Sequence, residues 1–582
     1  MQTFQSLLAK KLSDALRAAG LPAATGELTP ASDPRFGDYQ TNAALVLGKQ
    51  RGENPRVLAE KIVAQIEAGD LCESPSVAGA GFINFTLRPG AVAEKTMELS
   101  RNQRLGVAEV ESPRRIIIDF GSPNVAKPMH VGHIRSIVLG DALARIAQFL
   151  GHEVIRDNHL GDWGTQFGMV IYGWKNLLDR QALQRDPLAE IVRIYKETNE
   201  RATKDPNVRE ACRQELIKLQ AGDRENVDIW KQCVVFSMQD FECVYKLLDV
   251  HYDLQCGESF YHDRLPGVVE RLLKSGIGEI SEGAIVVFFR DNSELADKPL
   301  IIRKRDGGFN YATTDLATID YRINDLKAGA IWYVVGAPQI LHFKQIFEIA
   351  RREGYTADLR HVTFGSILGE DRKLMKTRSG ENVPLRDLLE EACKRARKII
   401  EEKNPQLSED EKTNIADKIG IGAVKYADLS QYRMTDYVFS WDRMLSLQGN
   451  TAPYLQNAYV RIRSIFRKAG ESPVATPLSG VEGETGHRPT SLTLTHPAEL
   501  NLAKRLCQFA EIVPQVLNDF RPNILANYLF ELANSFHAFY EACPVLKSEE
   551  PARSSRLALC DLTGRVLKQG LGLLGIKVPE KM

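Results

Sequence analysis

Several features that are common in proteins are missing from this chain, and each absence excludes a class of protein. The nine cysteines contain no CxxC pair, and their odd number does not fit a closed set of disulfides. No run of about 18 apolar residues occurs, so no membrane-spanning helix is expected. No cluster of histidines and cysteines has the spacing of metal ligands, so no metal site is expected. We therefore expect a cytoplasmic protein without a membrane partner.

The common phosphate-binding loops are also absent. Neither GxxxxGK[ST] nor GxGxxG occurs, so a nucleotide would have to be bound by another device. There is no excess charge either, because 75 Lys and Arg residues are balanced by 75 Asp and Glu residues. This balance gives no indication of a nucleic-acid partner, but it does not exclude one, since phosphate contacts need only local basic patches.

The chain does contain enough apolar residues, 43% of its 582, for several domains with their own cores. Composition and spacing predict three parts. Residues 1–108 predict a small α/β domain, and residues 109–385 predict an α/β domain with a mostly helical insertion at about 176–300. Residues 386–582 predict an all-α domain, in which the segment 469–498, rich in Gly, Ser, Thr and Pro, is a loop.

The central part has the pattern of a parallel sheet. An apolar strand in RRIIIDF (114–120) is followed by an amphipathic helix in HIRSIVLGDALARIAQFLG (133–151) and a second strand in HEVIRD (152–157). Strand, helix and strand in this order form a βαβ unit, whose two strands are parallel. Two further buried strands are expected in AIWYVVG (330–336) and HVTFGSIL (361–368). We therefore predict a Rossmann-like sheet domain.

A polar segment, SPNVAKPMHVGH (122–133), joins the first strand to the helix. It lies where open parallel sheets bind ligands, and the helix N-terminus that follows attracts phosphate. His130 and His133 can donate hydrogen bonds to phosphoryl oxygens, and Lys127 adds a positive charge. Gly132 allows a flat base or a ribose to lie close to the backbone. The alternative is an ordinary strand–turn–helix junction whose histidines only cap or pack.

A second, basic segment follows much later in the chain, LGEDRKLMKTRSGENV (368–383). Its lysines Lys373 and Lys376 predict a cationic clamp that stabilises a leaving pyrophosphate. The alternative is a solvated basic loop, which is the usual role of such a run of charges.

These two segments resemble the HIGH and KMSKS signatures of class I aminoacyl-tRNA synthetases. HVGH is a near match, and KLMKT keeps both lysines of KMSKS, while Met375 replaces the central serine. Longer strings resemble arginyl-tRNA synthetases: DFGSPNVAKPMHVGH, GDWGTQFG, GESFY, NYATTDLA, QGNTAPYLQNAYVRIRSI and the terminal PEKM. FGDYQTNAA and GAGFINFTL resemble the additional N-terminal domain of that family. The resemblance runs nearly from end to end, and it identifies the chain as a member of that family.

The resemblance implies the residues of an arginine pocket, and the chemistry of these residues agrees with it. A planar guanidinium with five donors requires carboxylate acceptors. Tyr311 and Asp315 are spaced i, i+4, so they share one face of a helix. Taken alone, Asp315 fits a charge near a helix N-terminus, and Gln339 fits a loop amide. The implied pocket consists of Asp119, Ser122, Asn124, His133, Tyr311, Asp315 and Gln339.

The resemblance also implies the ATP site and the reaction. ATP, with Mg²⁺, is expected at Lys127, His130, Gly132, His133, Lys373 and Lys376. The residues expected to be catalytic are Lys127, His130, His133 and Lys376. L-arginine attacks the α-phosphorus of ATP, and the arginyl group then passes to the terminal adenosine of tRNA(Arg). Such catalysis consists of positioning and charge stabilisation. A pocket that leaves polar groups unpaired with lysine needs no editing domain.

The C-terminal part interleaves aromatic rings and cations in one helical stretch. The residues expected to bind tRNA there are Tyr454, Tyr459, Arg461 and Arg463. Rings and cations of this kind suit unpaired RNA bases. The alternative is an amphipathic helix whose tyrosines are half buried. In the family, this all-α domain reads the anticodon, the N-terminal domain contacts the outer corner of the tRNA, and the protein is usually a monomer.

Two other functions remain to be weighed. One is a nucleotidylyltransferase that shares HxGH but does not act on tRNA; the long C-terminal helical part argues against it. The other is a tRNA-binding protein without activity; the presence of His130, His133, Lys376 and Asp315 argues against that.

Overall fold

The computed structural model describes residues 1–23, 27–31, 33–375, 382–470 and 491–582. The described chain forms two compact units, each of which combines segments that are distant in the sequence. The terminal unit contains residues 1–109, 446–572 and 577–582, and the sheet unit contains residues 110–445 and 573–576. Residues 386–445, which the sequence analysis groups with the C-terminal helices, thus lie in the sheet unit.

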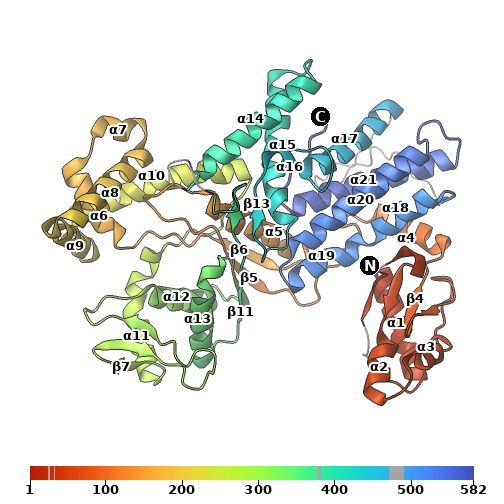
Figure 1. Cartoon of the computed structure of the whole chain (residues 1–582), viewed down its shortest axis with the longest axis horizontal. Helices are drawn as coiled ribbons and strands as arrows, with labels where there is room; N and C mark the ends of the chain where they lie inside the picture. Colours follow the sequence, from red (N-terminus) through yellow and green to blue (C-terminus); the bar gives the residue numbers. More distant parts are fainter. Residues whose placement is uncertain (24–26, 32, 376–381, 471–490) are drawn as a thin grey trace. The chain divides into compact units, whose positions relative to one another are not determined.

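A four-stranded parallel sheet, in the order β11-β10-β5-β6, forms the centre of the sheet unit (Figure 1). Helix α5 (Ile134–Phe149) connects β5 to β6, which confirms the predicted βαβ unit. Ile116, Ile117 and Ile118 have no exposed surface, as expected for a parallel strand covered on both faces. The strands are β5 (Arg115–Asp119), β6 (Glu153–Asp157), β10 (Ala330–Tyr333) and β11 (Asp358–His361).

One predicted strand is displaced. The structure has β11 and then a separate two-residue strand, β12 (Ile367–Leu368), in place of one continuous strand over residues 361–368. The backbone N–H of Gly365, which lies between them, donates to the carbonyl of Arg433. The segment leaves the large sheet because its backbone groups bond to this later part of the chain, where β12 pairs in parallel with β13 (Tyr437–Val438).

The insertion is mostly helical, as predicted, but it ends in a small sheet that the sequence analysis does not predict. Its first five helices pack on a core that includes Phe167, Ile191 and Cys233 and also Val125 and Ala126 of the segment after residue 119. They are α6 (Gln166–Leu177), α7 (Arg180–Arg185), α8 (Pro187–Lys204), α9 (Pro206–Gln220) and α10 (Arg224–Leu248). Next come the 3-10 helix η3 (Glu258–Arg264), α11 (Leu265–Lys274) and the antiparallel strands β7 (Glu279–Ser281), β8 (Ala284–Val287) and β9 (Leu300–Arg303). Such short strands lack the longer alternation that indicates a strand in a sequence.

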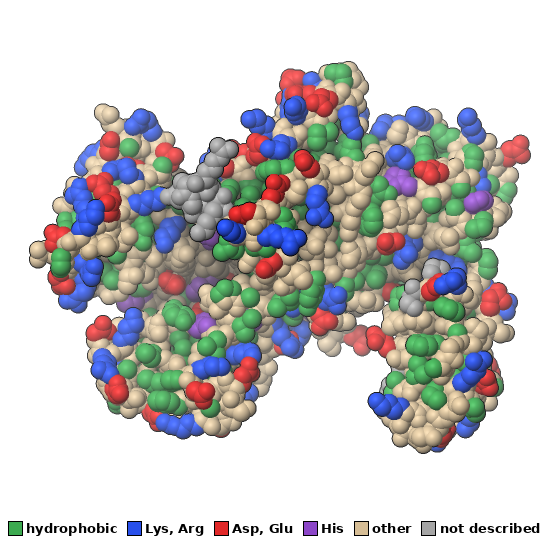
Figure 2. Space-filling view, in the orientation of Figure 1, with side chains coloured by type: hydrophobic (Ala, Val, Ile, Leu, Met, Phe, Trp, Pro, Cys, Tyr) green, Lys and Arg blue, Asp and Glu red, His purple; other side chains and the backbone are tan. Residues whose placement is uncertain are grey.

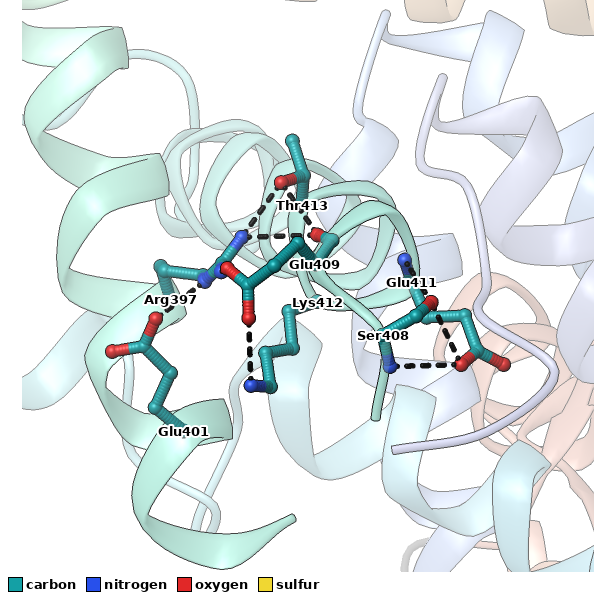
Figure 3. A network of polar contacts seen from close by, with 7 residues as sticks. All are labelled: Arg397, Glu401, Ser408, Glu409, Glu411, Lys412 and Thr413. Carbon is teal, nitrogen blue, oxygen red and sulfur yellow. Dashed lines mark hydrogen bonds and ion pairs between the residues drawn. The ribbon is translucent and has the colours of Figure 1, made fainter. Parts of the chain in front are cut away.

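Helices α14 (Leu385–Lys403) and α15 (Glu409–Leu429) form a hairpin in the sheet unit (Figure 3). Ser408 and Glu411 make a capping box at the start of α15, in which each side chain accepts a hydrogen bond from the backbone N–H of the other residue. Arg397 of α14 donates to the carbonyl of Glu409, the first residue of α15, and to the hydroxyl of Thr413, one turn further along that helix. These contacts fix the turn between the two helices.

The terminal unit combines an antiparallel sheet near the N-terminus with the last helices of the chain. The sheet has the order β1-β2-β4-β3, and buried Glu511 of α19 accepts hydrogen bonds from the backbone of Gln5 and from the hydroxyl of Tyr39. The first part contains α1 (Phe4–Ala18), β1 (Leu28–Pro30), β2 (Tyr39–Thr41), α2 (Ala43–Arg51), α3 (Pro55–Val63), β3 (Ser76–Ala78), β4 (Phe82–Phe85) and α4 (Pro89–Arg101). The last helices are α17 (Ala452–Ala469), α18 (Pro497–Cys507), α19 (Phe509–Asn518), α20 (Pro522–Ala542) and α21 (Ala552–Leu573). The predicted N-terminal α/β layer and the predicted helical end are therefore both present.

The surface carries both signs of charge. Basic and acidic side chains are interspersed over the face drawn in Figure 2, as expected from their equal totals. Among the described helices, none is long and apolar enough to cross a membrane.

Candidate active site at the carboxyl end of the parallel sheet

The two histidines lie together where the segment after β5 enters α5. Their imidazole rings are 4.1 Å apart between centroids, and they flank the 3-10 turn η2 (Val131–His133). The backbone N–H of Gly132 donates to Nδ1 of His130, and the backbone N–H of His130 donates to Nδ1 of His133, each over 3.1 Å. In a neutral imidazole whose Nδ1 accepts, Nε2 carries the proton. The His130 ring therefore offers an Nε2–H group as a donor, whereas Nδ1 of His133 lies within hydrogen-bonding distance of both the N–H and the carbonyl oxygen of His130, at 3.1 and 3.2 Å.

Burial keeps both imidazoles neutral. Burial, followed by the influence of the neighbouring His130, lowers the pKa of His133 to about 4. Burial and then the positive charge of Lys127 lower the pKa of His130. The Lys127 side chain itself is exposed, and its Nζ lies 5.4 Å from the centre of the Tyr195 ring on α8. At neutral pH both rings are therefore uncharged, and Lys127 supplies the nearby positive charge.

Asp119, the last residue of β5, is buried, and each of its carboxylate oxygens has a partner. The hydroxyl of Ser122 donates to Oδ1 over 3.0 Å, and Nη2 of Arg322 donates to Oδ2 over 2.7 Å. The same Nη2 lies 2.7 Å from Oδ2 of Asp157. Ser122 has a φ of 46°, a strained value for a residue with a side chain, and its N–H donates to the side chain of Asn158. Asp119 is thus held in place from two sides.

Helix α12 (Tyr311–Asp320) carries Tyr311 and Asp315, and one histidine contacts both. His342, on α13 (Ile340–Arg352), has its Nε2 2.6 Å from Oδ2 of Asp315, and its ring centroid lies 4.7 Å from that of Tyr311. Tyr311 is 55% exposed, and the Asp315 side chain is 23% exposed. The helix therefore presents a phenol and a carboxylate side by side, both accessible to a ligand.

A buried carboxyl group, Glu258 of η3, adds to the acidic character of the site. Burial, followed by the charge of Asp315, raises the pKa of Glu258 to about 7. Burial also raises the pKa of Tyr333, the last residue of β10. The charge of Arg322 lowers this pKa, and the charges of Asp119 and Asp315 raise it. Asp119 is the register partner of Tyr333, and the charge of Asp315, which is distant in the sequence, acts on the same phenol.

Two amides expected in the pocket lie at exposed positions. Asn124 forms a parallel bridge with Gly161, which belongs to the GDWGTQFG string. Gln339 ends the 3-10 turn η5 (Ala337–Gln339) immediately before α13. Both side chains are therefore accessible to a ligand.

The sequence analysis does not identify His342, Glu258 or Arg322. Glu258 lies in GESFY, a string that supports the family resemblance and that was the available signal for this residue. Arg322 contacts Asp119 across 203 residues, and no periodicity or spacing in the sequence connects the two.

Comparisons with known proteins agree with this geometry. Three family models match: "tRNA synthetases class I (R), catalytic domain" over residues 95–441, "DALR anticodon binding domain" over 455–582, and "Arginyl tRNA synthetase N terminal domain" over 3–87. The Arginine–tRNA ligase of Synechococcus elongatus is 46% identical over 567 residues, covering 95% of each chain. That of Chromobacterium violaceum is 43% identical over 589 residues, covering 100% of each. The chain belongs to the arginyl-tRNA synthetase family.

Solved structures of arginyl-tRNA synthetases have the same fold. The enzyme of Plasmodium falciparum matches with a TM-score of 0.84 and 30% identity, over 100% of both chains. That of Thermus thermophilus matches with a TM-score of 0.83 and 26% identity, over 99% of this chain and 100% of the other. The predicted multidomain α/β architecture is confirmed, and the chain is an enzyme, an arginine–tRNA ligase of class I.

The KMSKS-like segment of this arginyl-tRNA synthetase is described only in part. Lys373 is exposed, and its carbonyl accepts a hydrogen bond from the N–H of Gly369 over 2.8 Å. Lys376, which the sequence analysis expects to be catalytic, lies outside the described residues.

Two of the residues expected to bind tRNA connect α17 to α20. The hydroxyl of Tyr454 donates to the side chain of Asn534 over 2.7 Å. Nη1 of Arg461 lies 3.1 Å from Nδ1 of His537. Both residues of α17 are partly exposed, so they combine a structural contact with a face toward solvent.

The other two residues expected to bind tRNA hold the end of the chain. The hydroxyl of Tyr459 donates to one carboxylate oxygen of Glu580 over 3.0 Å, and Nε of Arg463 donates to the other over 2.6 Å. Tyr459 is only 4% exposed, which agrees with the alternative in which this amphipathic helix buries its tyrosines. Arg463 is partly exposed.

The bridge between Asn124 and Gly161 yields a prediction about the pocket. A Cβ atom at Gly161 would lie 2.3 Å from Oδ1 of Asn124, so Gly161→Ala displaces this amide. We expect the KM for arginine to rise about 10-fold, the value for one hydrogen bond to a charged group, in steady-state aminoacylation. Gly164→Ala, in the same loop, meets its nearest neighbour, Gln166, at 3.1 Å and is the matched control. An unchanged KM in folded Gly161→Ala would exclude Asn124 from arginine binding.

Proposed function

We propose that this arginyl-tRNA synthetase binds L-arginine between the end of β5 and helix α12, next to ATP on the twin histidines. The observation that carries the proposal is that, in addition to burial, the charges of Asp119 and Asp315 raise the pKa of the Tyr333 phenol and the charge of Asp315 raises the pKa of Glu258. Several carboxyl groups in one partly buried place are costly unless a cation joins them. Arginine supplies two positive charges, one on its guanidinium and one on its α-ammonium group.

The guanidinium is assigned to the α12 side of the pocket. Asp315 and the hydroxyl of Tyr311 accept from its planar donors, and Glu258 adds a second carboxylate. His342 bonds to Oδ2 of Asp315, which leaves Oδ1 for the substrate. Lysine, a compact ammonium ion, would leave part of this array unpaired, and this supports selection against it.

The α-ammonium group is assigned to the strand side of the pocket. Asp119 accepts from it, and Ser122 supports the same carboxylate oxygen through its hydroxyl. The amides of Asn124 and Gln339 bond to the amino-acid backbone, and His133 lies at the border with ATP. This arrangement directs the arginine carboxylate toward the α-phosphorus.

ATP is assigned to the start of α5 and to the basic segment. His130 and His133 donate Nε2–H groups to phosphoryl oxygens, Gly132 allows the nucleotide to lie close to the backbone, and Lys127 adds positive charge. Lys373 and Lys376 stabilise the departing pyrophosphate. Within the described residues no group of three His, Cys, Asp or Glu side chains could hold a metal ion, so we propose that Mg²⁺ enters bound to ATP.

The reaction proceeds in two steps on this scaffold. An oxygen of the arginine carboxylate attacks the α-phosphorus, the bond to the β-phosphate oxygen breaks, and pyrophosphate leaves. The 2′-hydroxyl of the terminal adenosine then attacks the carbonyl carbon of arginyl-adenylate, and AMP leaves. No protein nucleophile is required, so the residues act through position and charge.

The remaining parts are assigned to tRNA(Arg). We propose functional parts at 1–108, 109–385 and 386–582, in which the first contacts the outer corner of the tRNA and the last reads the anticodon. Tyr454, Arg461 and Arg463 present partly exposed rings and cations for this contact, and Tyr459 supports them from the interior of α17. We place the enzyme in the cytoplasm as a monomer.

The proposed function is tested by isotope exchange between pyrophosphate and ATP. We expect exchange that requires arginine, measured with and without tRNA(Arg). Exchange that is independent of any amino acid would instead indicate a nucleotidylyltransferase. The absence of exchange under both conditions would indicate a tRNA-binding protein without activity.

Asp315→Ala tests the assignment of the guanidinium site. Loss of a charged hydrogen-bond partner predicts a rise of about 10- to 100-fold in the KM for arginine and almost none in the KM for ATP. Asp320→Ala is the matched control, because Asp320 lies on the same helix but accepts from Tyr355. Equal changes in both Michaelis constants would contradict the role of Asp315.

The raised pKa of Glu258 predicts a pH dependence of arginine recognition. Above pH 7 the group is a carboxylate and attracts the guanidinium; as the pH falls through about 7 it takes up a proton and this attraction is lost. We expect kcat/KM for arginine to fall below about pH 7 in the native enzyme and to be low and flat in Glu258→Gln. His133 titrates near pH 4 and does not contribute in this range. A native-like pH profile in Glu258→Gln would rule the assignment out.

A further inference from the structure

Arg322 has no exposed surface, and its guanidinium lies across the ends of three neighbouring strands. Tyr333, Asp119 and Asp157 are the last residues of β10, β5 and β6, and they are register partners in the parallel sheet. Side chains of register partners project to the same face of a sheet. The guanidinium carbon of Arg322 lies 5.2 Å from the centre of the Tyr333 ring, and its Nη2 lies 2.7 Å from an oxygen of each carboxylate.

The backbone that carries Arg322 continues directly from the helix assigned to the substrate guanidinium. Helix α12 ends at Asp320 and passes into the π-helical turn η4 (Tyr321–Asp325). Turns of this kind are frequent at functional sites. Through Arg322, the helix that carries Asp315 is therefore tied to the strand that carries Asp119.

We propose that Arg322 is a positioning residue, which orients Asp119 for the α-ammonium group of arginine. This inference rests on the proposed function, in which Asp119 binds that group. Arg322 occupies Oδ2 of Asp119, and Ser122 donates to Oδ1, so the plane of the carboxylate is fixed. Each carboxylate oxygen has two acceptor positions, and the second position of Oδ1 remains for the substrate.

The contact of one side chain with both Asp119 and Asp157 requires a guanidinium. Nε and Nη2 of Arg322 both donate to Oδ2 of Asp157, over 3.1 and 2.7 Å, while Nη2 also reaches Asp119. A lysine ammonium is a compact point charge on a flexible chain, and it cannot form this planar, two-sided contact. Arg322→Lys therefore keeps the positive charge but no longer fixes the orientation of the Asp119 carboxylate.

The first test compares Michaelis constants in Arg322→Lys. We expect the KM for arginine to rise about 10-fold or more, as for a lost charged hydrogen bond, and the KM for ATP to change less than about 2-fold. Arg156→Lys is the matched control, since Arg156 is a buried arginine on the same strand as Asp157 that bonds to Gln148 instead. A purely structural role of Arg322 would lower the melting temperature and leave the ratio of the two KM values unchanged, which would overturn the proposal.

The second test asks which part of the substrate arginine is bound by the Asp119 carboxylate that Arg322 orients. The probe is 5-guanidinopentanoic acid, which is arginine without its α-amino group, used as a competitive inhibitor of arginine-dependent exchange. Native enzyme should bind it about 10-fold or more weakly than arginine. In Arg322→Lys this difference should shrink to about 3-fold or less, because the α-ammonium contact is already weakened. An undiminished difference would overturn the proposal.

Asp119→Asn separates failure of this inference from failure of the proposed function. If Asp119→Asn still discriminates fully against the probe, the assignment of the α-ammonium group to Asp119 is wrong, and the inference falls with it. If Asp119→Asn loses the discrimination and Arg322→Lys retains it, only the role of Arg322 is wrong. Loss of the discrimination in both variants supports the proposal.

A second pair of variants serves if Arg322→Lys does not fold. Asp157 is not assigned to any ligand, but it anchors the far side of the guanidinium. Asp157→Asn keeps an acceptor oxygen for Arg322 and should change the KM for arginine less than about 3-fold, whereas Asp157→Ala releases the guanidinium and should raise it about 10-fold. Rescue by asparagine but not by alanine supports the proposal; equal values in the two variants would overturn it.

Discussion

The acidic end of the parallel sheet depends on one internal positive charge. Asp119 and Asp157 end adjacent strands in register, so their carboxylates necessarily lie close together on one face. Two buried negative charges at this distance repel each other, and desolvation adds to the cost. Arg322 offsets both effects from a position with no exposed surface. In our proposal, the pocket for a cationic amino acid is thus built around a cation that belongs to the protein.

Desolvation acts in opposite directions on the two halves of the site. At the start of α5 it lowers the pKa of His133 to about 4, which leaves a neutral ring. Near Asp315 it raises the pKa of Glu258 to about 7, together with the charge of that carboxylate. The same physical cause therefore produces a neutral imidazole at the start of α5 and, near α12, a carboxyl group that a bound cation would stabilise in its charged form.

The sequence predicts the features that depend on local order along the chain. The βαβ unit follows from apolar runs and a helical period, and the common face of Tyr311 and Asp315 follows from their spacing. Arg322 and His342 act through partners brought close only by the fold, so no local pattern reveals them, whereas Glu258 lies in the GESFY string, which is a signal for it in the sequence.

Secondary structure, too, could be predicted from the sequence only where it depends on local order along the chain. The segment around Gly365 has the apolar character of a strand, yet its backbone bonds to the carbonyl of Arg433, far along the chain. The small sheet β7–β9 was missed because its strands have only three or four residues. In both cases tertiary contacts decide between conformations that local propensity leaves nearly equal.

Balanced composition conceals an RNA-binding protein for a related reason. Many cations of this chain are paired internally, as Arg463 is with Glu580 and Arg322 is with Asp119 and Asp157. Equal numbers of positive and negative side chains therefore reflect the ion pairs that stabilise the fold as well as the contacts made with ligands. Phosphate contacts depend on the positions of individual exposed cations, and Lys127 is exposed beside the twin histidines. The net charge of a large enzyme thus says little about whether it binds a polyanionic partner. The positions of individual positive side chains determine such binding.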